Sequence, residues 1–475
     1  MIVLMKKTLV RILTRGLLAL TLVTASAGTA WAKPKHLLVV TTTTGFRHSS
    51  IGTAEKILAE LGHSSGVFTV EYARVEPNSP EFKGADGKPD TAKVNAAITK
   101  VLAEKMSLAA LQHYDGVIFA NTTGDLPLPD KQGFLDWIKA GHAFIGMHSA
   151  SDTFHGFPPF VEMLGSEFLT HGAQATVEAL NQDPKHPATK HFGQSYVVHD
   201  EIYIMKNFDR DQVHGLLTQD KHPNTGAPGD YPIAWCKQVG QGHMFYTSLG
   251  HREDVWEAAV YQQHILGGIK WALGLEKGDA TPQSTRAALS AAEVKDGFHP
   301  LFDGVTLAGW HLRTADGVKS WSAQNGMLVN TLAEGSHGTD LVTDEKYWNF
   351  TVRFEYMIPK KSNSGFYLRG RHEIQIYDDY EGKEAKPNGN GAIYNLKAPS
   401  QFVSRKPGEW QQVEATIIGN KVSVTLNGVK VHDNVEVTRA TGSELDANVN
   451  DPGSLFLQGD HGAVAFRNVR LKPLK

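Results

Sequence analysis

Cysteine is almost absent from this 475-residue sequence, which contains only Cys236. A single thiol cannot form an internal disulfide bond. Cys236 ends the apolar run at residues 232–236, a pattern typical of a buried strand. This context predicts a buried, inert thiol and not a catalytic nucleophile.

An excess of charge of either sign is also missing. The formal net charge is -3, and charged residues make up 20% of the chain. A protein without a basic excess has little capacity to release counterions from phosphates, so nucleic acid is not an expected partner. A small, near-neutral ligand is compatible with this balance.

Long hydrophobic runs are absent beyond the N-terminus, so no later segment is expected to span a bilayer. At the N-terminus, basic residues such as Lys6 and Lys7 precede an apolar run at residues 16–23 and small residues that end at Ala32. This order predicts a secretory signal peptide over residues 1–32 and hence a secreted, periplasmic protein. A membrane anchor is the alternative, but the apolar run is short and interrupted.

The first part of the mature chain alternates strand and helix patterns. Apolar runs at residues 37–40, 116–120 and 143–147 indicate buried strands, and residues 51–61 and 129–138 have helical patterns. This alternation predicts an α/β domain with a parallel sheet covered by helices on both faces. Ligands of such folds bind beyond the carboxyl ends of the strands.

The second part has a different character. Residues 350–356, 413–418 and 422–426 alternate apolar and polar side chains, and Asn427-Gly428 is a hairpin turn signal. Many short strands of this kind predict an antiparallel, jelly-roll-like β-sandwich. The expected organisation is therefore a signal peptide at 1–32, an α/β domain at 33–277, a polar linker at 278–296 that is partly helical near its end, and a β-sandwich at 297–475.

The segment LRGRHEIQIYDD, at residues 368–379, contains the most informative strand pattern of the second domain. Alternation places Glu373, Gln375 and Tyr377 on one face and aliphatic side chains on the other. A carboxylate, an amide and a phenol in a row suit a sugar site, but a solvent-facing strand would show the same alternation. Arg369 lies four residues before Glu373 on the same nominal face, and we expect it to hold Glu373 ionised.

Several motifs of the second domain together resemble the 3-keto-disaccharide hydrolase domain family. They are GFHPLFDG (297–304), NSGFYLR (363–369), EIQI (373–376), GAIY (391–394), PGEW (407–410), LQGDHG (457–462) and FRNVRLKPL (466–474). The resemblance covers residues 297–475 and implies a concanavalin-like sandwich. Members of this family are implicated in cleaving glycosides already oxidised to a ketone at C3, sometimes with a divalent metal.

The chemistry implied by this resemblance begins with abstraction of the acidified C2 proton by a carboxylate. The group on C1 then leaves by elimination, and addition of water completes net hydrolysis. The implied roles are Glu373 as base or metal ligand, Arg369, Gln375 and His461 as polarising or positioning groups, and Asn363, Tyr394, Gln458 and Tyr377 as substrate contacts. For His461, a hydrogen-bonded turn histidine is an equal alternative.

Most of the 22 histidines lie in the first domain, and three of them follow strand-like runs: His48, His148 and His251. Each alone would be read as a structural histidine. Three at equivalent strand ends leave two alternatives of equal weight, structural histidines or a site for acid/base chemistry or a divalent metal ion. With Asp152 and Glu201 they form the candidate site. The candidate metal ligands are His48, His148, Glu201 and His251, and no nucleotide cofactor is expected.

The same domain resembles the trehalose-utilisation (ThuA-like) family over about residues 35–275. The matching pieces are GFRH (45–48), IGMHSA (145–150), Gly165 with Phe168 and His171-Gly172, DEIY (200–203) and FYTSLGH (245–251). The resemblance implies a flavodoxin-like fold of the class I glutamine-amidotransferase type. His148 occupies the elbow where an amidotransferase has its nucleophilic cysteine, which excludes thioester chemistry. Ser149 lacks the Gly-x-Ser-x-Gly elbow of a serine nucleophile.

ThuA-like relatives are linked to the processing of 3-keto-disaccharides, so both halves of the chain point to oxidised sugars as the partner. We predict an exported enzyme that cleaves 3-keto-glycosides, with Glu373, Arg369, His461 and His148 as its catalytic residues. The two domains are expected to divide elimination and hydration between them. A non-catalytic carbohydrate-binding protein and a conventional glycoside hydrolase are the alternatives.

Overall fold

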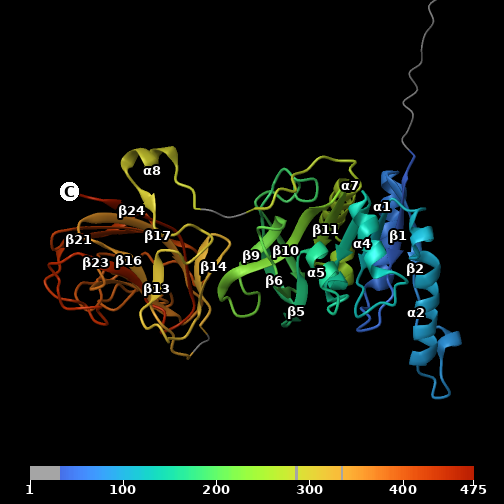
Figure 1. The fold of residues 1–475 in the computed structure, drawn as a ribbon. Helices are drawn as coiled ribbons and strands as arrows, with labels where there is room; N and C mark the ends of the chain where they lie inside the picture. The colour runs from blue at the N-terminus through green and yellow to red at the C-terminus, as the bar shows by residue number, and fades with distance from the viewer. Residues whose placement is uncertain (1–32, 284–286, 333–334) are drawn as a thin grey trace, which may run out of the picture.

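The computed structural model describes residues 33–283, 287–332 and 335–475. The predicted signal peptide lies outside these residues. No helix within the described ranges is long and apolar enough to cross a membrane. The chain forms an α/β domain and an all-β domain that lie side by side (Figure 1).

The α/β domain is built on a nine-stranded sheet, with a separate two-stranded ribbon formed by β5 and β8. Its strands are β1 (Lys35–Val40), β2 (Phe68–Ala73), β3 (Gly116–Ala120), β4 (Ala143–Met147), β5 (Glu167–His171), β6 (Ala175–Asn181), β7 (Ser195–Asp200), β8 (Tyr203–Lys206), β9 (His214–Lys221), β10 (Pro228–Val239) and β11 (Gly242–Thr247). Its helices are α1 (Ile51–Ser65), α2 (Thr91–Lys105), α3 (Leu108–Leu111), α4 (Lys131–Lys139), α5 (Pro158–Leu164), α6 (Glu253–Glu257) and α7 (Ala259–Ala272), with 3-10 turns η1 (Pro80–Phe82) and η2 (His148–Asp152).

The strand order of the large sheet is β2-β1-β3-β4-β11-β10-β9-β6-β7. The part from β2 to β11 is parallel, as the sequence predicts, whereas β10, β9, β6 and β7 run antiparallel to their neighbours. The prediction of a parallel sheet therefore holds for this part of the sheet, and the antiparallel part was not predicted. Successive strands β9, β10 and β11 are joined by short turns, which can connect only antiparallel neighbours, because a parallel connection needs a long crossover.

Helices cover both faces of this sheet, as predicted. One apolar cluster joins α1 and α7 to alternate side chains of the central strands, for example Val39 and Ile145. The other cluster joins α2, α4 and α5 to the opposite side chains, for example Leu38 and Phe144. Cys236 is fully buried, which confirms its predicted location in the core.

The all-β domain is a sandwich of two antiparallel sheets, which confirms the predicted class. One sheet has the order β14-β15-β24-β17-β20-β21-β22, with β12 pairing to β24, and the other has the order β13-β16-β23-β18-β19. The strands are β12 (His299–Pro300), β13 (Trp310–Leu312), β14 (Trp321–Gln324), β15 (Met327–Asn330), β16 (Leu341–Tyr347), β17 (Phe350–Met357), β18 (Asn363–Leu368), β19 (His372–Tyr377), β20 (Gln411–Ile418), β21 (Lys421–Leu426), β22 (Val429–Glu436), β23 (Gly453–Leu457) and β24 (Val464–Pro473).

The core of the sandwich lies between the two sheets. Phe354 of β17 stacks on Phe366 of β18 with ring centroids 4.1 Å apart, and Ile374 and Ile376 of β19 belong to the same apolar cluster. The aliphatic side of LRGRHEIQIYDD therefore faces the core, as expected. The polar side of β19 must face away from it, on the outer face of the five-stranded sheet.

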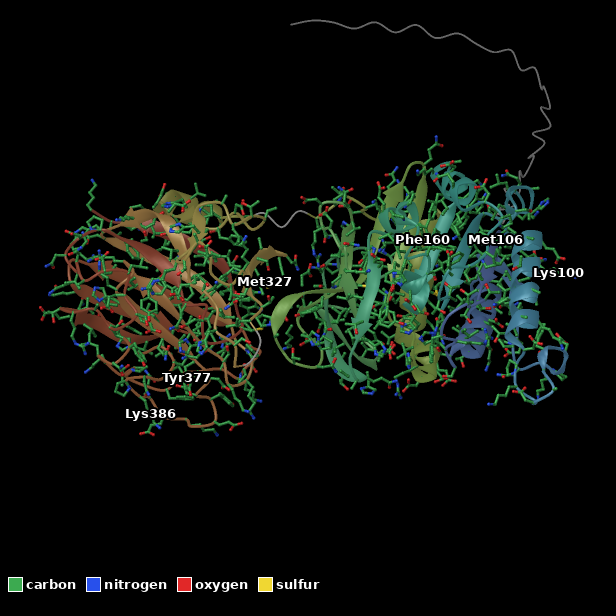
Figure 2. All side chains as sticks on the ribbon, turned by 60° about the horizontal axis from the view of Figure 1, so that its bottom comes forward. Lys100, Met106, Phe160, Met327, Tyr377 and Lys386 are labelled. Atoms are coloured by element: carbon green, nitrogen blue, oxygen red, sulfur yellow. The ribbon has the colours of Figure 1, made fainter. Side chains whose placement is uncertain are left out.

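The polar segment between the domains ends in helix α8 (Ala291–Asp296), which begins at a capping box formed by Ser290 and Glu293. The two domains also contact each other directly. The indole N–H of Trp410 donates to Asp220 at 2.7 Å, and the amide of Asp230 donates to Gln324 at 3.0 Å. Figure 2 shows the same contact region, where Met327 lies on the side of the sandwich that faces the α/β domain.

Candidate functional sites

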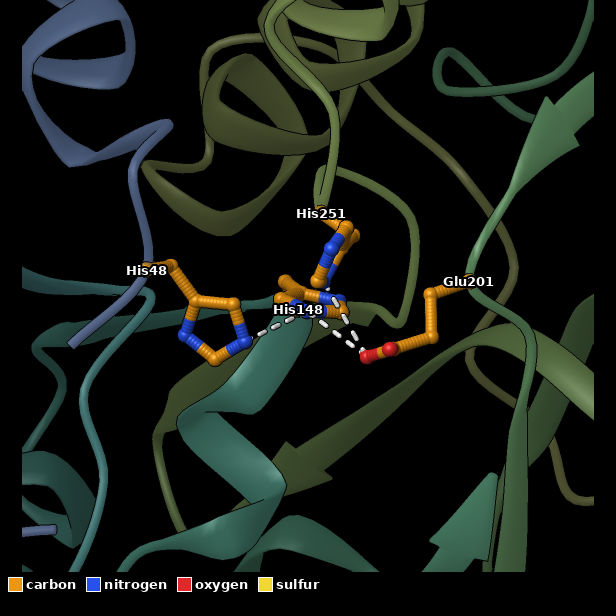
Figure 3. A group of neighbouring side chains, drawn as sticks. All are labelled: His48, His148, Glu201 and His251. Atoms are coloured by element: carbon orange, nitrogen blue, oxygen red, sulfur yellow. Dashed lines mark hydrogen bonds and ion pairs between the residues drawn. The ribbon is translucent and has the colours of Figure 1, made fainter. Parts of the chain in front are cut away.

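Four predicted residues of the α/β domain converge at the carboxyl ends of the parallel strands (Figure 3). His48 follows β1, His148 begins η2 directly after β4, and His251 follows β11. Glu201 joins them from the connection between β7 and β8. One imidazole nitrogen from each histidine and one oxygen of Glu201 all lie within 4.8 Å of one another.

The hydrogen bonds around His148 orient its ring. Its Nδ1 is 2.8 Å from the carbonyl oxygen of Ser248, and because a carbonyl can only accept, Nδ1 carries the proton. The Nε2 lone pair therefore points into the cluster, where it lies 3.2 Å from Nε2 of His48 and 3.8 Å from Glu201. A backbone carbonyl behind a histidine ligand is a common arrangement in metal sites.

Burial keeps the paired imidazoles neutral at pH 7. It lowers the pKa of His48 to about 4, and the neighbouring His251 adds to this effect. Burial and the neighbouring His48 also hold the pKa of His148 well below its usual value. Burial acts to raise the pKa of Glu201, but the surrounding histidines lower it overall, which keeps the carboxylate ionised.

This donor set fits a divalent metal ion. Imidazoles and carboxylates are the ligand types that zinc and similar ions take in proteins. Nδ1 of His251 lies 3.1 Å from Glu201 Oε2, and this pair raises the pKa of His251 and lowers that of Glu201. The convergence of four donors of these types at the strand ends is the feature that fits a metal ion.

Two further residues lie at the cluster but were not predicted as ligands or as partners of ligands. The hydroxyl oxygen of Tyr203 lies 3.0 Å from Nε2 of His148, and Nδ1 of His171 lies 3.1 Å from the second oxygen of Glu201. Both residues lie in motifs that carry the ThuA-like resemblance, and those motifs were the signal that could have identified them. Asp152, by contrast, was a site candidate, but its carboxylate binds His155 and lies outside the group of four.

The second candidate site is on the outer face of the five-stranded sheet, around Glu373 of β19. Tyr367 lies directly opposite Glu373 on β18, and its hydroxyl donates to Glu373 Oε2 at 2.8 Å. Gly365, two residues earlier on the same face of β18, lies beneath the other carboxylate oxygen, where any side chain would collide with it. The amide of Glu373 donates to Thr441 at 2.9 Å, from a loop that covers this end of the strand.

Glu373 is only 3% exposed, so this strand is not the solvent-facing strand that the pattern alone also allowed. Burial raises the pKa of Glu373 to about 7, and the charges of Asp340 and Asp460 add to this, although the hydrogen bond from Tyr367 acts in the opposite direction. A carboxyl group with a pKa near neutrality can exchange a proton at physiological pH, as a general base must.

Arg369 does not hold Glu373 ionised, and that expectation is wrong. Arg369 lies in the β18–β19 turn with a left-handed backbone (φ 57°), so strand alternation does not extend to it. Its guanidinium donates to the carbonyl of Trp348 at 2.6 Å, donates to the carbonyl of Gly419 at 2.8 Å, and stacks over the Trp348 ring. In the described chain it makes no hydrogen bond or ion pair with Glu373. Arg369 therefore fastens the turn.

The predicted substrate contacts are distributed unevenly over this face. Gln375 is buried beside Glu373, whereas Tyr377 at the end of β19 is 40% exposed (Figure 2). Asn363 and Gln458 each present a buried side-chain oxygen without a hydrogen-bond partner among the described residues. Tyr394 is half-buried, and its amide donates to the carbonyl of Glu373.

His461 is an exposed histidine whose Nδ1 contacts the carboxylate of Asp460. This contact is the hydrogen-bonded turn arrangement that the sequence left open. Asp460 itself lies close enough to Glu373 for its charge to raise the pKa of Glu373. The sequence analysis missed Tyr367, Asp340 and Asp460 at this site. Only the first could have been found, because the hairpin register places Tyr367 opposite Glu373.

Comparison with known proteins agrees with this division into two domains. Residues 36–272 match the family model described as trehalose utilisation (ThuA), and residues 297–472 match the model of the 3-keto-alpha-glucoside-1,2-lyase-like domain. The chain is a ThuA domain joined to a 3-keto-alpha-glucoside-1,2-lyase-like domain. The resemblances to both families are thereby confirmed.

Individual relatives of both domains are known. A curated protein named 3-keto-disaccharide hydrolase, from Bacteroides thetaiotaomicron, is 24% identical over 296 residues, a match that covers 51% of this chain and 98% of that protein. A solved structure from Parabacteroides distasonis, described as a candidate glycosyl hydrolase, is 26% identical and covers 40% of this chain and all of its own, with a TM-score of 0.34. A candidate ThuA-like protein from Parabacteroides merdae is 19% identical and covers 53% of this chain and 94% of its own, with a TM-score of 0.41.

The raised pKa of Glu373 predicts a specific pH dependence of stability. Between about pH 4.5 and 7 the unfolded chain loses this proton while the folded protein keeps it, so the contribution of Glu373 falls as the pH rises. Glu373→Gln removes this titration. The free energy of unfolding of the variant relative to the unsubstituted protein should therefore rise by about 3 kcal/mol from pH 4 to pH 8. Urea unfolding at both pH values measures this difference, and an unchanged difference would contradict the raised pKa.

Proposed function

We propose that this protein is an exported enzyme that cleaves 3-keto-glycosides, including 3-keto-disaccharides, with Glu373 as the base. The observation that carries the proposal is a buried carboxyl group with a pKa of about 7 that accepts a hydrogen bond from Tyr367. The family of the second domain and the relative named 3-keto-disaccharide hydrolase support the substrate class.

In the proposed first step, Glu373 removes the proton from C2, which the ketone at C3 has acidified. The electron pair moves towards the ketone oxygen to give an enolate. When the pair returns, the bond between C1 and the glycosidic oxygen breaks, and the departing oxygen takes up a proton. Water then adds across the C1–C2 double bond, so that the sum of both steps is hydrolysis. A hydrogen-bond donor near the ketone oxygen stabilises the enolate.

Substrate hydroxyls are proposed to bind next to Glu373. Asn363 lies on β18, the strand next to β19, and Gln458 directly follows β23, which pairs with β18 on its other side. The side-chain oxygen of each has no hydrogen-bond partner in the described chain, and an oxygen of this kind accepts a hydrogen bond from a hydroxyl. Leaving such groups buried and unpaired costs about 1–3 kcal/mol each, which a bound sugar would recover. Gln375 and the exposed ring of Tyr377 extend the same surface. Arg369 has no part in this proposal.

The ThuA domain is proposed to carry a second site for the same substrate class. Its strand order β2-β1-β3-β4-β11 is the 2-1-3-4-5 order of flavodoxin-like folds, and the histidine cluster lies at the carboxyl ends of those strands, where such folds bind ligands. We propose that His48, His148, Glu201 and His251 hold a divalent metal ion. When bound, such an ion polarises oxygen atoms and lowers the pKa of water.

A conventional glycoside hydrolase is a second candidate, favoured by one observation. Asp340 and Asp460 are close enough to Glu373 for their charges to raise its pKa, so a second carboxylate is available on this face. Two carboxyl groups with separated pKa values are the usual equipment of glycosidases. Turnover of an unoxidised disaccharide by this protein would favour this candidate. Binding without turnover of either sugar would instead indicate a carbohydrate-binding protein.

The deciding experiment is incubation of the full chain with a 3-keto-disaccharide, with and without a chelator, and identification of the products. We expect free 3-keto-glucose without the chelator. Accumulation of an unsaturated 2-hydroxy-glycal in the presence of the chelator would show that elimination is independent of the metal and that hydration depends on it. No product under either condition would refute the proposed function.

A further inference from the structure

His155 lies between two carboxylates and has no role in the proposed function so far. Its Nδ1 is 2.6 Å from Glu167 Oε2, and its Nε2 is 2.7 Å from Asp152 Oδ1. A neutral imidazole has a single N–H and can donate to only one of them, whereas an imidazolium donates to both. Burial acts against the charge, but the two carboxylates outweigh it and raise the pKa of His155.

The two carboxylates belong to elements that carry different parts of the histidine cluster. Asp152 is the last residue of η2, whose first residue is His148. Glu167 is the first residue of β5, which pairs with β8, and in that register His171 lies opposite Tyr203. The hydroxyl oxygen of Tyr203 in turn lies 3.0 Å from Nε2 of His148, and Tyr203 lies two residues after Glu201 on the chain.

The backbone between His148 and His155 is strained at both ends. His148 and Phe154 both have left-handed backbones, with φ values of 48° and 62°, although neither is glycine. Such conformations cost on the order of 1–3 kcal/mol each and persist only where the surroundings fix them. The shape of this segment therefore depends on the contacts that hold it, which are backbone hydrogen bonds of Asp152 and Phe154 to Gly124 together with the side-chain contacts of His155.

His155 links η2 to the β5–β8 ribbon through Asp152 and Glu167. Glu167 has other partners, because it also accepts hydrogen bonds from Asn207 at 2.7 Å and pairs with Lys206 at 3.2 Å. The carboxylate of Asp152 is bound by His155. Removal of His155 would leave Glu167 held by Lys206 and Asn207, whereas the carboxylate of Asp152 would lose its contact with the β5–β8 ribbon. The backbone of η2 would keep its hydrogen bond to Gly124.

We propose that His155 is a positioning residue that fastens η2 to the β5–β8 ribbon and so sets the position of His148 relative to Tyr203 and Glu201. This inference rests on the metal site in the proposed function. A cationic bridge between two carboxylates is suited to this task because it attracts both sides at once.

The test uses His155→Gln in the full chain, with Co²⁺ as the probe. We expect the variant to bind Co²⁺ about tenfold more weakly than the unsubstituted protein, the lower end of the effect of outer-shell partners. The visible absorption bands of bound Co²⁺ should also change, since they report ligand geometry. His155→Arg should restore both properties, because a guanidinium can donate to both carboxylates. His36→Gln is the matched control, a histidine with 39% exposure, against 38% for His155, that faces Glu71 at the opposite end of β1.

Unchanged affinity and spectrum in His155→Gln would overturn the inference while leaving the metal site intact. Equal damage in His155→Arg and His155→Gln would overturn it too, since a bridging cation would then make no difference. If the unsubstituted protein bound no Co²⁺, the proposed metal site would fail and this inference with it. Should His155→Gln not fold, Asp152→Asn removes the same link from the other side and provides the same comparison.

Discussion

Glu373→Gln is expected to lower the turnover of a 3-keto-disaccharide by about 10³-fold, within the range that a lost general base costs. Glutamine has nearly the same shape and can still accept the hydrogen bond from Tyr367. It cannot take up the C2 proton, so the loss should appear in kcat with little change in KM. In the unsubstituted protein, kcat/KM should rise with pH through an apparent pKa of about 7, the value at which Glu373 becomes ionised.

The matched control is Glu355→Gln, which changes a partly buried glutamate on another strand of the same domain. Glu355 lies on β17 in the other sheet and pairs with Arg467 at 2.7 Å, so its loss should affect stability and leave turnover unchanged. Turnover of Glu373→Gln equal to that of the unsubstituted protein would remove Glu373 from the mechanism. A loss confined to KM would favour a binding role.

The strands of the α/β core were predictable because they are continuous apolar runs. Residues 116–120 and 143–147 are strands with the predicted bounds, since strands buried on both faces of a sheet contain almost no polar side chains. The antiparallel half of the sheet was not predicted. Its direction depends on short turns such as the one between β10 and β11, where Gly240 has a left-handed backbone. One turn decides the direction of a whole strand.

The sequence predicts the histidine cluster better than it predicts the surroundings of Glu373. His148 directly follows β4, and His48 and His251 lie in the segments that follow β1 and β11. The carboxyl ends of parallel strands lie at the same edge of the sheet. The surroundings of Glu373 depend instead on pairing between distant strands. Asp340, which precedes β16, reaches Glu373 of β19 through two intervening strands, and sequence spacing carries no information about that order. The prediction for Arg369 is wrong because it extends strand alternation through a turn.

His148→Ala is expected to weaken the binding of a divalent metal by more than about 100-fold, the upper end of the cost of losing an outer-shell partner. The variant loses one of the three proposed imidazole ligands, and Glu201 loses its contact with His148. His264→Ala is the matched control, because His264 is also fully buried and its Nδ1 also bonds a backbone carbonyl at 2.8 Å. Both variants open a similar cavity, but only His148→Ala should lose the metal, as measured by titration with Co²⁺. Equal affinities in the two variants would contradict the proposed ligand set.

The same variant separates the roles of the two domains. If the lyase-like domain eliminates and the ThuA domain hydrates, full-length Glu373→Gln fails at the first step and full-length His148→Ala fails at the second. Each protein then retains the site that the other has lost, so a mixture of the two should convert a 3-keto-disaccharide to free 3-keto-sugar, provided the intermediate diffuses between molecules. His148→Ala alone should accumulate the unsaturated intermediate. If His148→Ala alone forms the hydrolysed product at the normal rate, one site performs both steps, and the histidine cluster serves a different reaction.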